Sequence, residues 1–168
     1  MPILTEFNSL AEAEALALVE YWCAAKSWAA DVVGQRPYPD MDTLCAYAEE
    51  KWLETDEPSK LEAFAAHPLI GDVELLRKKY AETARAEQGQ VMQADETVLQ
   101  KLADLNVEYR DKFGFIFIVC ASGKSAAEML ALLEARLPNT RDQELHNAAV
   151  EQAQIMLLRL RQSIDLSE

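Results

Sequence analysis

The sequence is poor in residues that interrupt helices: its 168 residues include 5 glycines and 6 prolines. Half of the residues are hydrophobic, which excludes an intrinsically disordered chain and predicts one domain over residues 1–168. No apolar run reaches the about 20 residues that a membrane-spanning helix needs. The first seven residues lack the basic and apolar regions of a secretory signal. We therefore expect a cytoplasmic protein with no membrane partner.

Cysteine, histidine and positive charge are scarce as well. Three widely spaced cysteines among apolar neighbours predict reduced thiols in the core, and a catalytic Cys120 is the less favoured alternative. The two histidines form no pair at metal-ligand spacing, so we expect no metal site. A net charge of −13 disfavours a nucleic-acid partner. Glycine-rich phosphate loops and other cofactor signatures are missing from the sequence, so we expect no cofactor.

What the chain has in quantity is helical periodicity, divided by capping and breaking residues. These patterns predict an all-α fold, a single-domain helical bundle of about seven or eight helices with one short extended buried segment at 115–121. Capping boxes at Ser9, Ser125 and Thr140 and single capping residues at Ser27, Asp42, Asp72 and Asp95 predict helix starts, Pro58 suits a first turn, and Gly114 is the predicted left-handed stop of the helix before it. The predicted helices run from Ser9 to Cys23, Ser27 to Arg36, Asp42 to Leu53, Pro58 to Ala66, Asp72 to Gln90, Glu96 to Phe113, Ala126 to Leu137 and Arg141 to Ile164.

The segment 115–121, with the sequence FIFIVCA, interrupts the helical pattern. It is rich in β-branched and aromatic residues, but the sequence offers no second strand to pair with it. If it is extended and buried, its backbone N–H and C=O groups need other partners, and a polar ligand could supply them. A short helical turn is the alternative.

His67 stands where the fourth predicted helix must stop, because Pro68 disfavours the α conformation in the residue before it. A histidine at a helix end can point into a cleft. The alternative is a structural cation at the negative end of the helix dipole.

Two further polar positions are candidates. Glu87 and Gln88 lie near the end of a charged helix, where they either face a pocket or belong to the solvated surface. In the last helix, Arg159 continues a stripe formed by Leu145, Ala149, Gln152 and Met156. A guanidinium in line with inward-facing residues calls for an anionic partner, unless it reaches water at the rim of the core. The second histidine, His146, is predicted to lie on the surface.

Four stretches of the sequence together resemble the decarboxylases of 2-oxo-4-hydroxy-4-carboxy-5-ureidoimidazoline (OHCU). They are LEAFAAHPLIGD at 61–72, AEQ at 86–88, KFGFIFIVCASGKSAAEML at 112–130 and EQAQIMLLRL at 151–160. The resemblance covers nearly the whole chain in order. It implies an all-α fold, cofactor-free formation of (S)-allantoin in the last step of urate-to-allantoin conversion, and a homodimer.

The resemblance also implies roles for individual residues. His67, Glu87 and Arg159 would be catalytic. Substrate-binding positions would be Pro68, Ala84, Gln88, Phe117, Ile118, Val119, Cys120 and Ala121. Two departures stand out: Ala84 replaces a serine that is frequent in the family, and Ile116 replaces a frequent proline.

Two other functions remain open on the sequence alone. One is a decarboxylase or hydrolase for a related ureido or imidazole acid. The other is a non-catalytic helical interaction module. The catalytic hypotheses predict that the imidazole, the carboxylate and the guanidinium converge on one pocket, whereas the module predicts that they lie apart.

Overall fold

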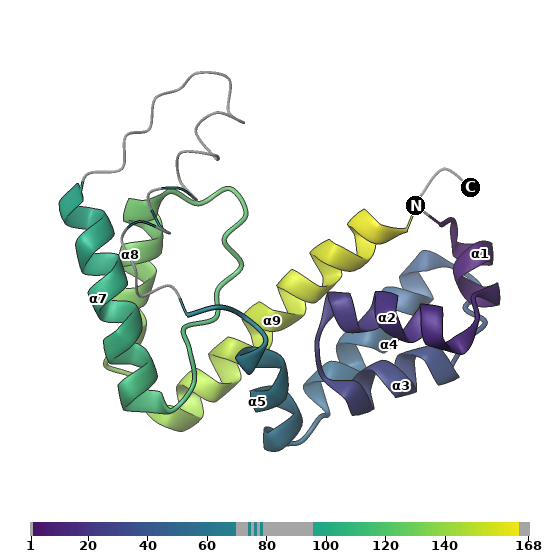
Figure 1. The fold of residues 1–168 in the computed structure, drawn as a ribbon. Helices are drawn as coiled ribbons and strands as arrows, with labels where there is room; N and C mark the ends of the chain where they lie inside the picture. Colours follow the sequence, from purple (N-terminus) through teal and green to yellow (C-terminus); the bar gives the residue numbers. More distant parts are fainter. Residues whose placement is uncertain (1, 70–73, 75, 77, 79–95, 165–168) are drawn as a thin grey trace. The chain divides into compact units, whose positions relative to one another are not determined.

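A computed structural model describes residues 2–69, 74, 76, 78 and 96–164 (Figure 1). Within these residues eight α-helices have defined bounds, three further residues are helical and no β-strand occurs, so the predicted all-α fold is confirmed. The chain divides into two compact units. The first unit comprises Met1–Ala66, Ile118–Cys120 and Asn147–Glu168, and the second comprises His67–Phe117 and Ala121–His146.

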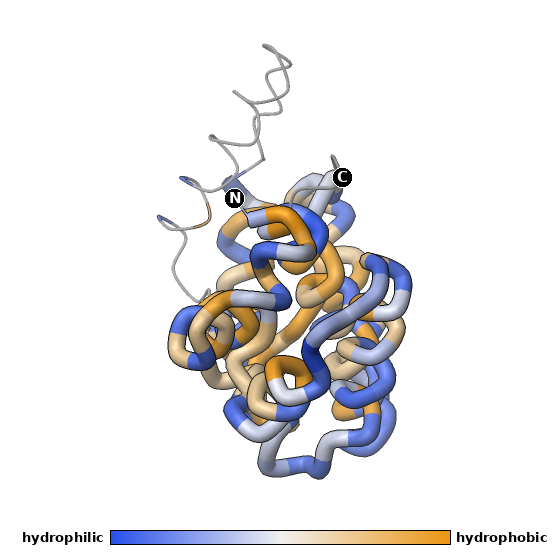
Figure 2. Tube along the Cα trace, turned by 90° about the vertical axis from the view of Figure 1, so that its right-hand side faces the viewer, coloured by the Kyte–Doolittle hydropathy of each residue, from blue (hydrophilic) through white to orange (hydrophobic). Residues whose placement is uncertain are grey.

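The first unit contains α1 (Leu4–Ser9), α2 (Glu12–Trp22), α3 (Lys26–Gly34), α4 (Met41–Leu53), α5 (Glu57–Ala65) and the part of α9 (Arg141–Ser163) that begins at Asn147. Helix α3 packs against α2, α4 and α5. Hydrophobic and hydrophilic stretches follow one another along the helical tube, which is the pattern expected when one side of each helix is apolar and the other polar (Figure 2).

All three tryptophans of the sequence are fully buried in the first unit. Trp28 donates its indole N–H to the carbonyl oxygen of Ala48 at 2.9 Å. Trp52 donates to the carbonyl oxygen of Ala149 at 2.8 Å, which ties α4 to α9. Because a buried indole N–H needs an acceptor, these bonds fix the depth at which each ring sits in the core.

The second unit contains α7 (Glu96–Phe113), α8 (Ala126–Arg136) and the first residues of α9. Helices α7 and α8 lie side by side and run in the same direction (Figure 1). This is possible because residues 114–125 lead the chain from the end of α7 back to the start of α8. Their C-terminal ends meet where Lys112 donates to the carbonyl oxygen of Leu137. Tyr109, Phe113, Phe115 and Phe117 form a chain of aromatic contacts beside α7.

Capping signals predicted the later helices better than the earlier ones. The predicted Glu96–Phe113 helix has the bounds of α7, and Ser125 and Glu128 form the predicted capping box of α8. Thr140 and Gln143 bond each other in the same reciprocal manner at the start of α9.

Three predicted N-caps were wrong. Ser9 ends α1, a helix that the sequence did not predict, and α2 begins after Ala11, which makes no side-chain cap. Ser27 lies inside α3, which starts at Lys26. Asp40 caps α4 through the N–H of Thr43 at 2.7 Å, so Asp42 lies in the first turn instead. Asp40 and Asp42 stand two positions apart at the start of α4, and periodicity alone does not show which of them is the N-cap.

Gly114 ends α7 with φ +82°, a conformation that places a Cβ under strain even though open space surrounds it. We predict that Gly114→Ala lowers the free energy of unfolding by about 1 kcal/mol. Urea denaturation followed by far-UV circular dichroism measures this change. Gly34→Ala is the matched control, since its φ is ordinary and its surroundings are equally open, and it should be neutral or stabilising. Equal losses in both variants would contradict this explanation.

Candidate functional site

His67 follows the end of α5, as its sequence position predicted. Asp56 caps the start of this helix by accepting from the N–H of Ser59 at 3.0 Å. The helix ends at Ala65, and the C-cap Ala66 still has helical dihedral angles. His67 is half-buried in a bend and Pro68 is exposed. The imidazole therefore leaves the chain at a helix terminus rather than on a helix face.

Three of the predicted site residues, Ala84, Glu87 and Gln88, lie outside the described residues. Of the predicted helix from Asp72 to Gln90, the described residues Glu74, Leu76 and Lys78 are helical, and Leu76 is buried.

Arg159 lies on α9 in the first unit, at the edge of the buried side of that helix. Ala149, Gln152 and Met156 of the predicted stripe are buried, whereas Leu145 and Arg159 are half-buried. The guanidinium is thus placed at the rim of the core, where its head group remains accessible.

Tyr21 holds the Arg159 guanidinium from one side. Arg159 donates from Nη1 to the carbonyl oxygen of Tyr21 at 3.1 Å, and its Cζ lies 5.4 Å from the centre of the Tyr21 ring. A carbonyl acceptor and a ring face both favour the cation without neutralising it. Both of these contacts of the guanidinium are therefore with uncharged groups.

The positive charge of Arg159 acts on the thiol of Cys23. Burial raises the pKa of this thiol to about 12, and the nearby guanidinium offsets the rise to a smaller extent. Cys23 therefore stays protonated at neutral pH. All three cysteines are free, as predicted, but Cys45 and Cys120 are half-buried rather than in the core.

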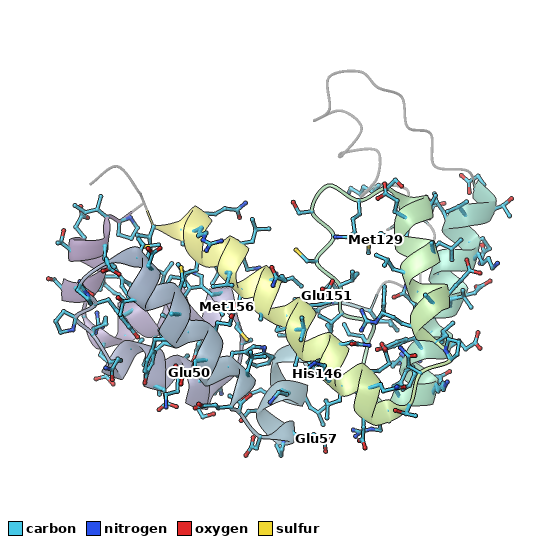
Figure 3. The ribbon with its side chains drawn as sticks, turned by 180° about the vertical axis from the view of Figure 1, so that it is seen from behind. Glu50, Glu57, Met129, His146, Glu151 and Met156 are labelled. Atoms are coloured by element: carbon cyan, nitrogen blue, oxygen red, sulfur yellow. The ribbon has the colours of Figure 1, made fainter. Side chains whose placement is uncertain are left out.

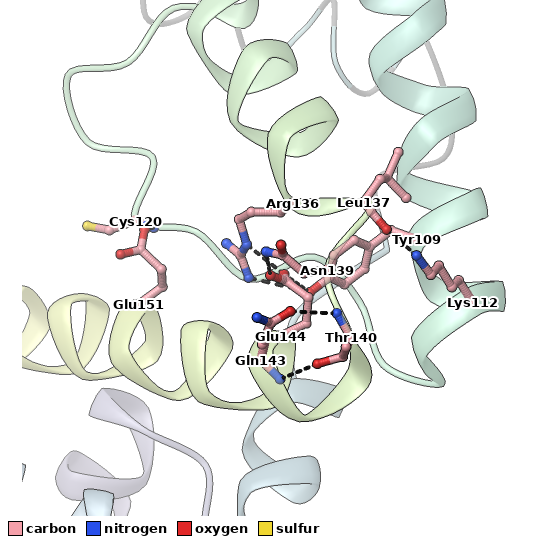
Figure 4. A network of polar contacts seen from close by, with 10 residues as sticks. All are labelled: Tyr109, Lys112, Cys120, Arg136, Leu137, Asn139, Thr140, Gln143, Glu144 and Glu151. Carbon is pink, nitrogen blue, oxygen red and sulfur yellow. Dashed lines mark hydrogen bonds and ion pairs between the residues drawn. The ribbon is translucent and has the colours of Figure 1, made fainter.

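The segment 115–121 has no regular secondary structure and is only partly buried. Phe115, Phe117 and Ile118 are buried, and Ile116 and residues 119–121 are half-buried. In the first unit, the N–H of Cys120 donates to Oε1 of Glu151 on α9 at 3.1 Å (Figure 4). The expectation that a ligand could satisfy the N–H groups of this segment therefore does not hold for Cys120, whose N–H already has a protein acceptor.

In the second unit, Phe117 lies against a network that the sequence analysis did not find. Glu144 is completely buried. Its Oε1 accepts from Tyr109 Oη at 2.5 Å and from Arg136 Nε at 2.7 Å, and its Oε2 accepts from Asn139 Nδ2 at 2.8 Å (Figure 4). The Arg136 Cζ lies 4.6 Å from the centre of the Phe117 ring. The guanidinium thus joins a buried carboxylate to the start of the predicted binding segment.

The sequence carried one signal for this network, a glutamate on the apolar side of an amphipathic helix, but its partners lie on α7, on α8 and in the connection between α8 and α9. Burial raises the pKa of the Tyr109 hydroxyl above its ordinary range, and the hydrogen bond to Glu144 adds to the rise. Tyr109 therefore acts as a hydrogen-bond donor across the physiological range.

The predicted site residues fall into two groups. The first unit holds Ile118, Val119, Cys120 and Arg159. The second unit holds His67, Pro68, Phe117 and Ala121.

His146, predicted to lie on the surface, is exposed on α9 (Figure 3). Among the described residues there is no cluster of side chains suited to a metal ion, and no helix long and apolar enough to cross a membrane.

The sequence matches the family model described as OHCU decarboxylase over residues 8–161. The chain belongs to the OHCU decarboxylase family. It is 35% identical over 141 residues to a uric acid degradation bifunctional protein of Arabidopsis thaliana, and this match covers 82% of this chain and 44% of the relative. It is 29% identical over 140 residues to an OHCU decarboxylase of Halalkalicoccus jeotgali, with coverage of 83% and 75%. The chain therefore spans less than half of the Arabidopsis protein and most of the Halalkalicoccus one.

Two solved structures resemble this member of the OHCU decarboxylase family. An OHCU decarboxylase crystallised in the presence of (S)-allantoin is 34% identical, with a TM-score of 0.71 and coverage of 86% of this chain and 94% of that one. An (S)-allantoin synthase has a TM-score of 0.77 over the whole of this chain and 56% of its own, at 21% identity. The second likeness concerns the fold alone.

The buried Glu144 network yields a stability prediction. Arg136→Met leaves the completely buried Glu144 carboxylate with one fewer donor, so the free energy of unfolding should fall by about 3 kcal/mol. Denaturant unfolding monitored by circular dichroism measures the loss. The double variant Arg136→Met, Glu144→Leu removes both charges and should recover much of it. Additive losses in the double variant would show that the two side chains do not interact.

Proposed function

We propose that this chain decarboxylates OHCU to (S)-allantoin and CO2, the last step in converting urate to allantoin, without a cofactor. Family membership over residues 8–161 carries this proposal. Its further support is the 34% identity to a decarboxylase crystallised with (S)-allantoin present. An acidic surface with a net charge of −13 is compatible with a small-molecule substrate and not with nucleic acid.

The reaction needs an electron sink, a proton donor and correct orientation. When the bond between the ring carbon and the carboxylate breaks, CO2 leaves and the bonding electron pair remains on the ring carbon. The neighbouring ureido-bearing carbon and its C=N nitrogen accept this pair and give an enol, so the substrate supplies the electron sink that a cofactor otherwise would. The hydroxyl on the decarboxylated carbon then becomes a carbonyl as its proton leaves. A proton delivered to one face of the ureido-bearing carbon gives one enantiomer of allantoin. The protein contributes positioning, charge stabilisation and the proton.

His67 is the proposed proton donor. An imidazole titrates closest to neutrality of all side chains, so it can give up a proton at physiological pH. Its place at the end of α5, half-buried, supports this role because the ring is not held within a helix face.

Arg159 is proposed to balance the anionic charge of the substrate. Glu87 would orient the substrate through its hydroxyl or ureido N–H groups, and Gln88 would donate and accept at the ring. The contact of Arg159 with Tyr21 supports its assignment, because the guanidinium has neutral partners there.

The remaining pocket positions are proposed to be Pro68, Ala84 and the backbone from Phe117 to Ala121. Ala84 has no hydroxyl, so a hydrogen bond that a serine would give the substrate is absent or comes from water.

His67→Asn tests the assignment, and the second histidine of the sequence provides the matched control. We predict at least a roughly 100-fold loss of kcat, since positioned proton transfer contributes on the order of 10²–10⁴-fold. His146→Asn, on an exposed position of α9, should leave kcat unchanged. Activity is measured on freshly generated OHCU by circular dichroism of the product, because spontaneous decay gives racemic allantoin. Wild-type formation of optically active allantoin by His67→Asn would refute the proposed role.

We further propose that the protein acts in the cytoplasm as a homodimer, as the family resemblance implies. Size-exclusion chromatography with light scattering should give twice the mass of the 18.8 kDa chain at micromolar concentration. A single-chain mass over the whole concentration range would contradict the dimer without affecting the proposed chemistry.

A further inference from the structure

Glu151 is a carboxylate that the proposed chemistry does not use, yet it contacts the proposed substrate-binding segment directly. It lies on α9 and is half-buried (Figure 3). Its Oε1 accepts from the backbone N–H of Cys120 at 3.1 Å, and both residues belong to the first unit. This hydrogen bond restrains the peptide unit between Val119 and Cys120.

Because a peptide unit is planar, restraining the Cys120 N–H also sets the direction of the Val119 carbonyl. Among the described residues the one cis peptide bond is Arg36–Pro37, so the bond between Val119 and Cys120 is trans. In a trans peptide the C=O and N–H groups lie in one plane and point in opposite directions. Because the Cys120 N–H points toward Glu151 on α9, the Val119 carbonyl points away from that helix.

A segment without regular secondary structure has no ladder of hydrogen bonds to set this orientation. Rotation of the two dihedral angles on either side of a peptide can turn its plane over, which would reverse the C=O and N–H directions. Glu151 opposes that rotation, since turning the plane would break the hydrogen bond between its half-buried carboxylate and the Cys120 N–H.

We propose that Glu151 is a positioning residue that holds the Val119 carbonyl as a hydrogen-bond acceptor for an N–H group of the substrate. This inference rests on the proposed function, which supplies a substrate with ureido N–H groups. The carboxylate acts through the 119–120 peptide and does not touch the substrate. What matters is the acceptor oxygen of Glu151 rather than its negative charge.

The closing experiment compares two substitutions at this position. Glu151→Ala removes the acceptor, and kcat/KM for OHCU should fall roughly 10-fold through a higher KM. Glu151→Gln keeps an oxygen in the same place and should stay within about 3-fold of wild type. Glu50→Ala, which removes an exposed carboxylate from α4 in the same unit, should match wild type. Thermal unfolding of each variant identifies any loss that comes from instability.

Hydrogen exchange of the Cys120 amide tests the contact without substrate. Its protection should fall in Glu151→Ala and persist in Glu151→Gln. Wild-type KM in Glu151→Ala, or an unchanged exchange rate at Cys120, would overturn the inference. A Glu151→Gln variant as impaired as Glu151→Ala would also overturn it, because the charge would then be what matters. If wild-type protein fails to turn over OHCU while the exchange pattern holds, the proposed function fails and the restraint on the peptide stands.

Discussion

A carboxylate removed from water is the strictest constraint in the described part of the chain. Glu144 is completely buried, and a buried charge is tolerated when several donors surround it. Its donors come from α7, α8 and the connection that leads into α9. The carboxylate is satisfied when these three elements meet at one point. The same Arg136 that pairs with it also covers Phe117, so the constraint extends to the start of the irregular segment.

The irregular segment shows how a helical protein can present backbone groups to a ligand. Backbone N–H and C=O groups within helices are consumed by the helices themselves. Residues 116–121 are outside any helix, and the Glu151 carboxylate on α9 accepts from the N–H of Cys120 where a neighbouring strand would do so in a sheet. Such support suits chemistry that depends on orientation, because displacement of a reacting group by about 1 Å can slow a reaction on the order of 100-fold.

The sequence predicted those parts of the fold that local chemistry determines. The bounds of α7, the left-handed Gly114 and the capping boxes of α8 and α9 each depend on residues within one turn, and they were confirmed. The start of α2 was wrong, since Ser9 completes a short helix whose burial against Trp22 a local motif does not reveal. The Glu144 network escaped prediction because its partners are 5 to 35 residues distant in sequence. For the candidate site, the helix-end position of His67 was predictable, whereas the partner of the Cys120 N–H was not.

The confinement of all three tryptophans to the first unit has a practical consequence for the study of folding. Indole fluorescence reports the surroundings of Trp22, Trp28 and Trp52, and thus the unfolding of that unit alone. Far-UV dichroism reports helices from both units. Coincidence of the two signals during denaturation is the criterion for a single cooperative transition. In this chain a separation of the two curves would directly resolve the order in which the units melt.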